Sequence, residues 1–536
     1  MRGLMQETPL TLDHFFRRGE RLFPRKEIVT AVPGGVQRRT YGEWAERSRR
    51  VGGVLDQLGI SASGRVASFA WNTGDHLDLW YSVPCSGRVL HTLNLRLFPE
   101  QLTYIVNHAE DEVIFLNRSL AGLLAPLVPT FKTVRHLVVM DDGMGDVPDI
   151  KGVEVHDYEA LLAGAQPVEF DVVKDEGQAA AMCYTSGTTG NPKGVVYSHR
   201  SIWLHTMGVM TSSGLGVRED DIALAVVPMF HANAWGMPHA APACGASMVM
   251  PGADLSPAAL VRLIEQERVT LACGVPTIWM GMIPEFEGHD VSSLRGATSG
   301  GAALPAAVAL AFEKVVGIPL RQGWGMTETS PVCSLYAPKS TVVDETELRT
   351  SVGFMLPGVD CRIIDPSTDT EQPWDGAATG ELQVSGPWIA RSYYDDERAG
   401  DSFTDDGWLR TGDVARVDPE GYVFLVDRTK DLVKSGGEWI SSAELENEIM
   451  AHPKVAEAAV IGVHHPKWTE RPLACVVPVA GETVTKDELI EFLTDRVAKW
   501  WLPDDVVTVD EIPKTSVGKF SKKTLREQFA DYQLPT

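Results

Sequence analysis

Tyr184-Thr-Ser-Gly-Thr-Thr-Gly-Asn-Pro-Lys193-Gly194 is the stretch of this chain that says most about its fold. Its glycines let backbone N–H groups approach an anion closely. The hydroxyl groups of Ser186, Thr188 and Thr189 add donors, and Lys193 adds a positive charge. This inventory favours a polyphosphate ligand, although clusters of Gly, Ser and Thr are also typical of plain surface loops. The segment is not a Walker A loop, because Pro192 precedes the lysine and Gly194 follows it.

Strand-like and helix-like stretches alternate along the chain. Residues 64–70 and 179–184 read as short apolar strands, residues 77–83 as the start of a helix, and Ser198 as the N-cap of another helix. This alternation predicts an α/β fold with layered sheets and helices. The second strand runs directly into the Gly-rich stretch, and the loop after a strand is a usual ligand site in such folds.

Four further segments stand out downstream of the first: Gly323-Trp-Gly-Met-Thr-Glu328-Thr329, Gly407-Trp-Leu-Arg-Thr-Gly-Asp413, Asp427-Arg428-Thr-Lys430-Asp431 and Pro513-Lys-Thr-Ser-Val-Gly-Lys519. In this order the five segments resemble the motifs of the adenylate-forming (ANL) superfamily, which includes acyl-CoA synthetases, peptide-synthetase adenylation domains and luciferases. Each segment alone is moderately specific, but together they cover nearly the whole chain. By this resemblance the chain is identified as a member of the superfamily, on the side of the acyl-CoA synthetases, or fatty-acid–CoA ligases.

Composition agrees with this reading. The 536 residues, 44% hydrophobic and 22% charged, are typical of a soluble globular protein and allow more than one domain. Lys and Arg total 48 against 72 Asp and Glu, and the net charge of −24 argues against nonspecific nucleic-acid binding. Anionic ATP and CoA must therefore be met by local basic groups.

Cysteine usage and the N-terminal sequence bear on the compartment. The seven cysteines are scattered without a C-x-x-C pair, which predicts free thiols in a reducing cytoplasm rather than a disulfide framework. The N-terminal stretch has no signal-peptide apolar core, and no apolar run reaches the length of a transmembrane helix. We expect a cytoplasmic enzyme; peripheral membrane contact stays open.

The resemblance also implies a domain division. It predicts a large N-terminal ATP- and acyl-binding domain over residues 1–429 and a small, mobile α+β domain over residues 430–536 that carries the catalytic lysine, with the hinge at Lys430. The pattern after the hinge fits a small α+β domain: helices over 442–450 and 486–500, strands over 456–463 and 473–479, and a loop over 434–437.

The resemblance implies two half-reactions in one site, with ATP, Mg²⁺ and coenzyme A. A carboxylate first attacks the α-phosphate of ATP, which gives an acyl-adenylate and pyrophosphate; the CoA thiol then displaces AMP. Both steps develop negative charge, which fixed cations and donors would stabilise. Lys519 is expected to bridge the attacking carboxylate and the α-phosphate. Without the other motifs it would read as a solvated lysine, and Lys514 is the weaker candidate.

The nucleotide site is carried over residue by residue. The phosphates are expected at Thr185, Ser186, Gly187, Thr188, Thr189, Gly190 and Lys193, and Mg²⁺ at Thr185 and Glu328. Adenine is expected at Gly300, Gly301, Ala302, Gly323, Trp324, Gly325, Met326 and Thr327. Asp413 would accept hydrogen bonds from both ribose hydroxyls, and Arg428 would donate to the ribose or phosphates. Tryptophan at 324 is a mild departure, because many relatives carry tyrosine there.

The segment Pro228-Met-Phe-His231-Ala-Asn-Ala-Trp235-Gly236 resembles the acyl-pocket entrance of the family. His231 would lie against the substrate carboxyl, Trp235 would gate the acyl tunnel, and Gly301 and Ala302 would line the substrate carbonyl. A lone histidine beside apolar residues is otherwise a satisfied core residue. CoA is expected along Lys434, Gly436, Gly437, Glu438 and Trp439, a stretch that alone would read as a plain turn.

Two other functions remain as alternatives. An acyl-AMP ligase would pass the adenylate to a carrier protein, but relatives of that type carry an insertion, and no extra segment is evident between Gly353 and Lys430. A non-catalytic nucleotide sensor would not be expected to keep Lys519, Glu328 and Asp413. We expect a medium- or long-chain fatty acid or a related acid as substrate, and a homodimer, common among relatives, is possible.

Overall fold

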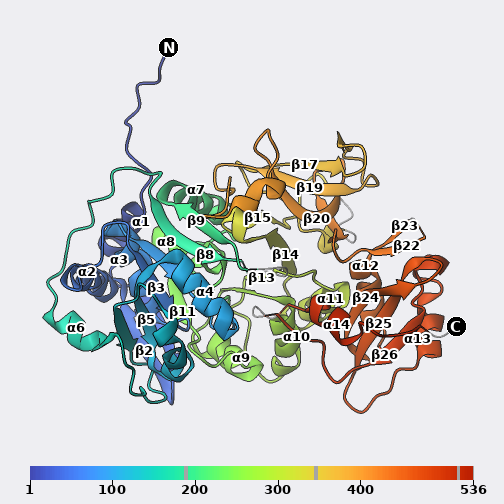
Figure 1. Cartoon of the computed structure of the whole chain (residues 1–536), viewed down its shortest axis with the longest axis horizontal. Helices are drawn as coiled ribbons and strands as arrows, with labels where there is room; N and C mark the ends of the chain where they lie inside the picture. The colour runs from blue at the N-terminus through green and yellow to red at the C-terminus, as the bar shows by residue number, and fades with distance from the viewer. Residues whose placement is uncertain (186–190, 343–347, 437, 516–518, 535–536) are drawn as a thin grey trace.

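The computed structural model describes residues 1–185, 191–342, 348–436, 438–515 and 519–534. A large N-terminal body of layered sheets and helices is followed by a smaller body at the C-terminal end (Figure 1). This confirms the mixed α/β class predicted from the alternating pattern. Within the described residues, no helix has the length and apolar character that a membrane crossing would require.

The first sheet has seven strands in the order β7-β6-β5-β3-β4-β8-β9. Its neighbours pair in parallel except β8 and β9, which pair antiparallel. Most of its central strands are buried along their whole length, as a parallel sheet covered on both faces requires. The strands are β3 (Arg65–Phe69), β4 (Val89–Thr92), β5 (Asp111–Asn117), β6 (His136–Met140), β7 (Glu154–Asp157), β8 (Ala179–Tyr184) and β9 (Gly194–Ser198).

The second sheet has nine strands in the order β16-β15-β14-β13-β12-β10-β11-β1-β2. It is parallel from β14 to β1 and antiparallel at both ends. The strands are β1 (Glu27–Val32), β2 (Gly35–Thr40), β10 (Ile222–Leu224), β11 (Ser247–Met250), β12 (Leu271–Gly274), β13 (Gly296–Gly300), β14 (Leu320–Gly325), β15 (Val332–Leu335) and β16 (Phe354–Met355).

The helices of the large body pack on these sheets and on one another. Ser198 caps α7 by accepting a hydrogen bond from the backbone N–H of Ser201, as predicted, and Thr40 and Glu43 form a capping box on α2. A core that includes Phe16, Trp44 and Trp80 joins several of them. The helices are α1 (Asp13–Leu22), α2 (Tyr41–Gln57), α3 (Gly74–Cys85), α4 (Pro99–Ala109), α5 (Ala121–Leu124), α6 (Tyr158–Gly164), α7 (His199–Met210), α8 (Met237–Cys244), α9 (Pro257–Gln266), α10 (Pro276–Glu285) and α11 (Ala306–Val316).

An antiparallel sheet of five strands completes the large body, in the order β18-β17-β19-β20-β21. Its last strand ends at Arg428, two residues before the expected hinge at Lys430. The strands are β17 (Asp360–Asp365), β18 (Thr370–Glu371), β19 (Gly380–Ser385), β20 (Leu409–Val417) and β21 (Val423–Arg428). Short 3₁₀ turns occur at Arg118–Leu120, Ala125–Thr130, Leu348–Thr350 and Glu397–Ser402, and two more are part of the site described below.

The chain leaves β21 at Arg428 and enters a separate small sheet at Val433. Strand β24 pairs with β25, and β25 also pairs with β22 and β26, while helices cover the sheet. The elements are β22 (Val433–Ser435), β23 (Glu438–Ile440), α12 (Ser442–Met450), β24 (Val455–His465), β25 (Thr469–Pro478), α13 (Lys486–Leu493), a 3₁₀ turn (Lys499–Trp501), β26 (Asp505–Thr508) and α14 (Lys522–Gln528).

Two predictions about the small body were wrong. The helix expected over 486–500 ends at Leu493, because the chain then turns to pack Val497 and Trp501 against the same apolar core that holds Leu489. The loop expected over 434–437 begins inside β22, whose residues pair with β23 across a tight hairpin.

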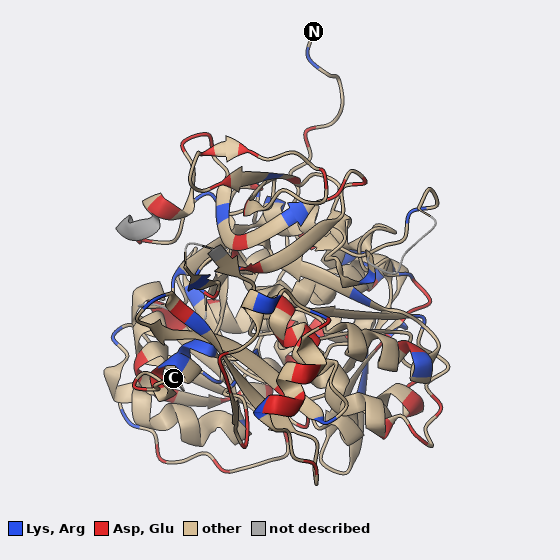
Figure 2. Ribbon diagram, turned by 90° about the vertical axis from the view of Figure 1, so that its right-hand side faces the viewer, with Lys and Arg blue, Asp and Glu red and all other residues tan. Residues whose placement is uncertain are grey.

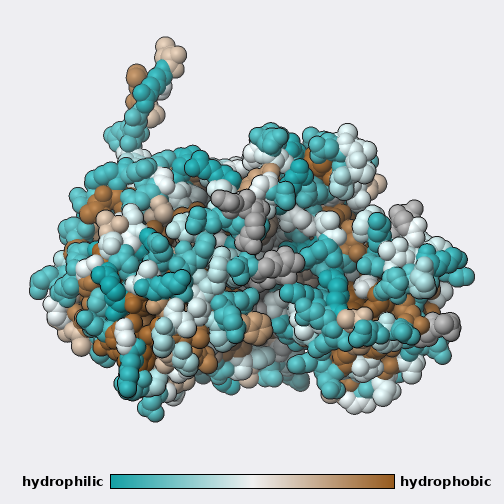
Figure 3. Space-filling model, in the orientation of Figure 1, coloured by the Kyte–Doolittle hydropathy of each residue, from teal (hydrophilic) through white to brown (hydrophobic). Residues whose placement is uncertain are grey.

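The surface views show how charged and hydrophobic residues are distributed. On the side of the molecule that carries the small body, basic and acidic residues are interspersed (Figure 2). The face in Figure 3 is mainly hydrophilic, with separate hydrophobic groups, one of them over the small body.

Candidate active site

A cavity of about 250 Å³ opens where the carboxyl ends of β13 and β14 face the end of β8 and the start of β9. Carboxyl ends of parallel strands are the usual ligand site in α/β folds. The cavity brings together predicted residues from widely separated parts of the chain: Thr185, Lys193, His231, Trp235, Gly300, Gly301, Gly323, Trp324, Gly325, Met326, Thr327, Glu328, Arg428 and Lys519.

Other predicted residues lie elsewhere. Asp413 lies in β20, where it contacts two lining residues, and Ala302 is exposed just after Gly301. Lys434, Gly436 and Trp439 belong to the β22–β23 hairpin of the small body and are not among the lining residues. The remaining predicted residues lie outside the described residues or, for Glu438, have a side chain outside them: Ser186, Gly187, Thr188, Thr189, Gly190, Gly437 and Glu438.

Lys519 reaches the cavity from the small body. The space beside Gly301 is so narrow that a Cβ on that glycine would stand 3.1 Å from the Lys519 Cε and 3.7 Å from its Nζ. Gly301 also has a φ of +82°, which favours glycine. Burial lowers the pKa of Lys519 to about 8, and the charge of Arg428 acts in the same direction. The lysine is thus a desolvated cation, in a place where a bound anion would stabilise its charge.

His231 lies in the same cavity as a neutral imidazole. Burial lowers its pKa to about 3, and the nearby positive charge of Lys519 adds to the effect. A neutral ring can donate one hydrogen bond and accept another, but it adds no positive charge. Of these two neighbouring side chains, Lys519 is therefore the one that can carry a positive charge.

Glu328 also lines the cavity and is buried, in the 3₁₀ turn Thr327–Thr329. Tyr393 donates a hydrogen bond of 2.6 Å from its hydroxyl to the Glu328 Oε1. Burial raises the pKa of Glu328, and the Tyr393 hydroxyl opposes that change by stabilising the carboxylate. The ammonium of Lys193 lies 4.4 Å from the centre of the Tyr393 ring, in cation–π contact. Tyr393 therefore contacts both the Glu328 carboxylate and the Lys193 ammonium of the cavity.

Trp324, Asp413 and Arg428 form a second organised group. The Trp324 indole N–H donates to the Asp413 Oδ2 at 2.8 Å, and the Arg428 Nε lies 3.0 Å from the Asp413 Oδ1. The negative charge of Asp413 is the main cause of the raised pKa of Arg428. Tryptophan at position 324 thus holds the buried carboxylate through its indole N–H. A tyrosine there would have no ring N–H and could donate only from its hydroxyl group.

The apolar end of the cavity is shaped by a left-handed turn. Ala232, Asn233, Ala234 and Trp235 have φ values of 42°, 53°, 46° and 55°, a region in which non-glycine residues are strained. The turn, Ala232–Gly236, sends the Trp235 ring toward β13, where a Cβ on Gly300 would stand 3.0 Å from it. Leu215, Val332 and Leu335 add apolar walls. The basic side chains among the described lining residues are Lys193, Arg428 and Lys519.

Several lining residues were missed from the sequence: Asn191, Leu215, Ala232, Thr298, Pro331, Val332, Leu335 and Tyr393. Tyr393 is the most informative of them. It meets Glu328 across 65 residues of chain, and no local spacing marks it.

The described residues of the β22–β23 hairpin do not line the cavity. Trp439 is half exposed, and the Lys434 ammonium lies 5.5 Å from the centre of its ring. A Cβ on Gly436, whose φ is +64°, would meet the Trp468 ring at 2.6 Å. The structure therefore places Lys519 in the cavity while the hairpin stays outside it.

The comparisons with known proteins agree with this geometry. A family model described as AMP-binding enzyme matches residues 16–394, and one described as AMP-binding enzyme C-terminal domain matches residues 444–519. The chain is 46% identical to a long-chain-fatty-acid–CoA ligase of Thermus thermophilus, over 98% of this chain and 97% of that protein. It is 42% identical to a 3-methylmercaptopropionyl-CoA ligase of Ruegeria lacuscaerulensis, over 99% of both.

Solved structures give the same result. ATP-bound MatB from Rhodopseudomonas palustris has a TM-score of 0.84 and 28% identity, covering 97% of this chain and 99% of that one. The chain therefore belongs to the AMP-binding enzymes, the adenylate-forming superfamily, on its acyl-CoA synthetase branch.

Proposed function

We propose that this acyl-CoA synthetase joins ATP to a fatty or fatty-like carboxylic acid in the cavity around Lys519, and then transfers the acyl group to CoA. One observation carries the proposal: a desolvated lysine from the small body meets Gly301, His231 and Glu328 of the large body in one cavity. That arrangement suits a step in which an anionic carboxylate attacks an anionic phosphate.

In the first step, the ammonium of Lys519 would contact both the attacking carboxylate and the α-phosphate, and so offset their mutual repulsion. His231 would orient the carboxyl group by hydrogen bonding, because its ring is neutral. Lys193 and Arg428 would bind phosphate oxygens, and Asp413 the ribose hydroxyls. Asp413 already accepts a hydrogen bond from Trp324 and forms an ion pair with Arg428, and both contacts hold it in place. The rate gain would come chiefly from preorganised charge.

Mg²⁺ fits the donors on the nucleotide side of the cavity. Mg²⁺ prefers one or two protein oxygens together with phosphate oxygens, and Glu328 and Thr185 both line the cavity with oxygen-bearing side chains. The hydrogen bond from Tyr393 favours the ionised form of the Glu328 carboxylate, against the effect of burial. Glu328 and Thr185 would hold the ion, which would neutralise phosphate charge.

For the second step we propose a rotation of the small body about Lys430. Lys519 and the β22–β23 hairpin belong to the same small body, yet only Lys519 lines the cavity in this pose. Rotation between residues 428 and 433, where the chain passes from one sheet to the next, would exchange them. Domain division at residue 430 and CoA binding along Lys434, Gly436 and Trp439 belong to this proposal.

A medium- or long-chain fatty acid is the substrate that the apolar end favours. Trp235, Leu215, Val332 and Leu335 offer no charge to a second polar group of the acid. Relatives at similar identity are named for different acids, a long-chain fatty acid and 3-methylmercaptopropionate among them. Trp235 would set the usable length of the acyl chain.

The proposal also includes a cytoplasmic location for the enzyme and its assembly as a homodimer. The seven cysteines are all free in the structure, which suits a reducing compartment.

The test uses purified enzyme with ATP, Mg²⁺ and a panel of straight-chain acids together with 3-methylmercaptopropionate. Acid-dependent pyrophosphate release without CoA, followed by acyl-CoA formation when CoA is added, is the expected result, with the highest kcat/KM on an unbranched apolar acid. Pyrophosphate release that never leads to acyl-CoA would instead favour transfer to a carrier protein. Highest kcat/KM on a charged or short acid would contradict the apolar assignment.

A further inference from the structure

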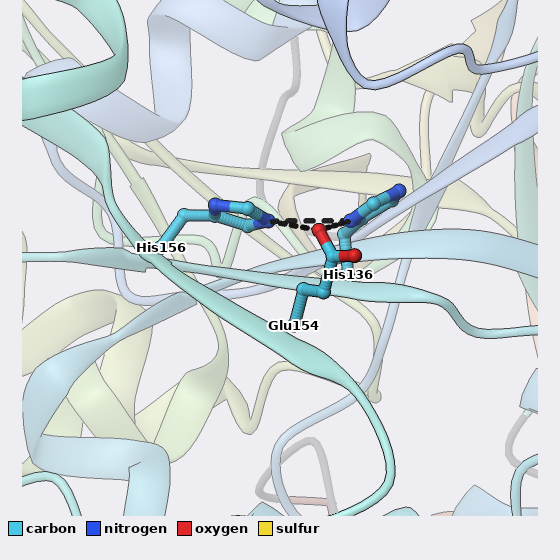
Figure 4. A group of neighbouring side chains, drawn as sticks. All are labelled: His136, Glu154 and His156. Atoms are coloured by element: carbon cyan, nitrogen blue, oxygen red, sulfur yellow. Dashed lines mark hydrogen bonds and ion pairs between the residues drawn. The ribbon is translucent and has the colours of Figure 1, made fainter.

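Two histidines and a glutamate meet at the outer edge of the seven-stranded sheet (Figure 4). His136 begins β6, and Glu154 and His156 lie in the edge strand β7. The parallel register pairs His136 with Glu154, and His156 follows two residues later, so all three side chains project from the same face. The cluster lies at the opposite edge of this sheet from β8 and β9, which border the cavity.

The three ligand atoms form a nearly regular triangle. The His136 Nδ1 lies 3.2 Å from the His156 Nε2, and the Glu154 Oε2 lies 3.4 Å from the former and 3.6 Å from the latter. An ion bound tetrahedrally at about 2.0–2.1 Å has ligand atoms separated by about 3.3 Å along each edge. The triangle therefore has the dimensions of one face of a zinc coordination tetrahedron.

Hydrogen bonding alone accounts poorly for this convergence. A neutral imidazole has one N–H and one lone pair, and a carboxylate has lone pairs only. Suppose that one of the two facing ring nitrogens carries a hydrogen. The facing nitrogen of the other ring and the Glu154 oxygen then compete to accept that one hydrogen bond, at distances beyond 3 Å. A cation at the centre would be contacted by all three lone pairs at once.

The surroundings fit a ligand role. The side chains of His136, His156 and Glu154 are 11%, 21% and 73% exposed, so the fourth side is open to water.

We propose that His136, Glu154 and His156 bind one Zn²⁺ ion, with water as the fourth ligand. Two imidazoles and one carboxylate are a donor set that suits zinc, and the ion would connect the short edge strand β7 to β6. Because the site lies away from the cavity, its role would be structural rather than catalytic.

The test begins with untagged enzyme that has been stripped with a chelator and dialysed. Wild type and His156→Ala are equilibrated with Zn²⁺, and bound zinc is measured by mass spectrometry, with the melting temperature as a second reading. Wild type is expected to retain one zinc per chain and to melt at a higher temperature with the ion. His156→Ala is expected to lose that zinc and the shift, while the metal-free proteins melt alike.

Two control variants guard against binding elsewhere. His464→Ala removes an exposed histidine whose neighbour His465 projects from the other face of β24, so the pair cannot chelate one ion. Glu328→Gln removes the carboxylate of the cavity. Both variants should retain the zinc. Zinc that persists in His156→Ala, or that is lost in either control, overturns the proposal.

Co²⁺ gives a reading that does not depend on stability. Four-coordinate Co²⁺ absorbs visible light far more strongly than six-coordinate Co²⁺, so the wild type loaded with Co²⁺ should be intensely coloured and His156→Ala should not. Glu154→Gln should weaken binding at least tenfold and keep both histidines. Weak absorption by the wild type, or unchanged affinity in Glu154→Gln, would contradict the proposed ligand set.

Discussion

Replacing Lys519 by alanine should nearly abolish adenylation and leave thioester formation largely intact. Burial and neighbouring cations lower the lysine pKa from 10.5 to about 8. A shift of this size corresponds to about 3 kcal/mol of unfavourable free energy for the charged form, at about 1.4 kcal/mol per pKa unit. An anionic nucleotide and carboxylate would restore that free energy, mostly in the transition state, so the variant should adenylate about 10²–10³-fold more slowly.

The assay separates the half-reactions. Acid-dependent pyrophosphate release reports the first, and conversion of a supplied acyl-adenylate with CoA reports the second. The matched control is Lys514→Ala, which removes a lysine of the same segment that pairs at 2.8 Å with Glu457 on the surface. It should leave both half-reactions unchanged.

Folding is checked by the melting temperature. Lys519→Ala removes a desolvated charge beside Arg428, so its melting temperature should equal or exceed that of the wild type. Equal losses in both half-reactions, or an equally slow Lys514→Ala, would refute the assignment of Lys519 to adenylation.

Three further predictions follow from the same geometry. The charged form of Lys519 is expected to be the active one and its pKa is about 8, so kcat/KM for ATP should fall as the pH rises through that value. A flat pH profile would exclude this titration. The Lys519→Arg variant, although impaired, should show no such fall, because arginine stays protonated. Trp235→Ala should change the preferred chain length with little change in the KM for ATP, measured over a series of acids; a changed KM for ATP with the same acid preference would identify Trp235 as a core residue. Lys430→Pro fixes one backbone angle at the proposed hinge, so single-turnover acyl-adenylate formation should persist while thioester formation falls steeply; a well-folded variant that makes the thioester at the wild-type rate would exclude rotation there.

The sequence predicted well the features that depend on local pattern. The strand β8, the N-cap at Ser198 and the helix α12 follow from apolar spacing and a capping residue, and all three are confirmed. The assembly of Lys519 with Glu328 in one cavity was expected from the order of five motifs, not from spacing. The catalytic role of those residues stays a prediction.

Features that depend on tertiary packing were not predictable. Tyr393 binds Glu328, and Trp324 binds Asp413 across 89 residues, and neither pair has a local signal. The left-handed turn before Gly236 contains non-glycine residues that intrinsic preference would place elsewhere. Helix α13 ended early because Val497 and Trp501 are buried against a core that is assembled from distant strands.

The position of Lys519 along the chain has a consequence for biosynthesis. Of the cavity-lining residues in the described part of the chain, Lys519 leaves the ribosome last, long after Thr185 and Glu328. A nascent chain that has folded its large body could therefore bind nucleotide before it holds the lysine needed to use it. If Lys519 acts as proposed, an unfinished or truncated polypeptide would form acyl-adenylate only at the low rate expected of Lys519→Ala, until translation has passed that lysine.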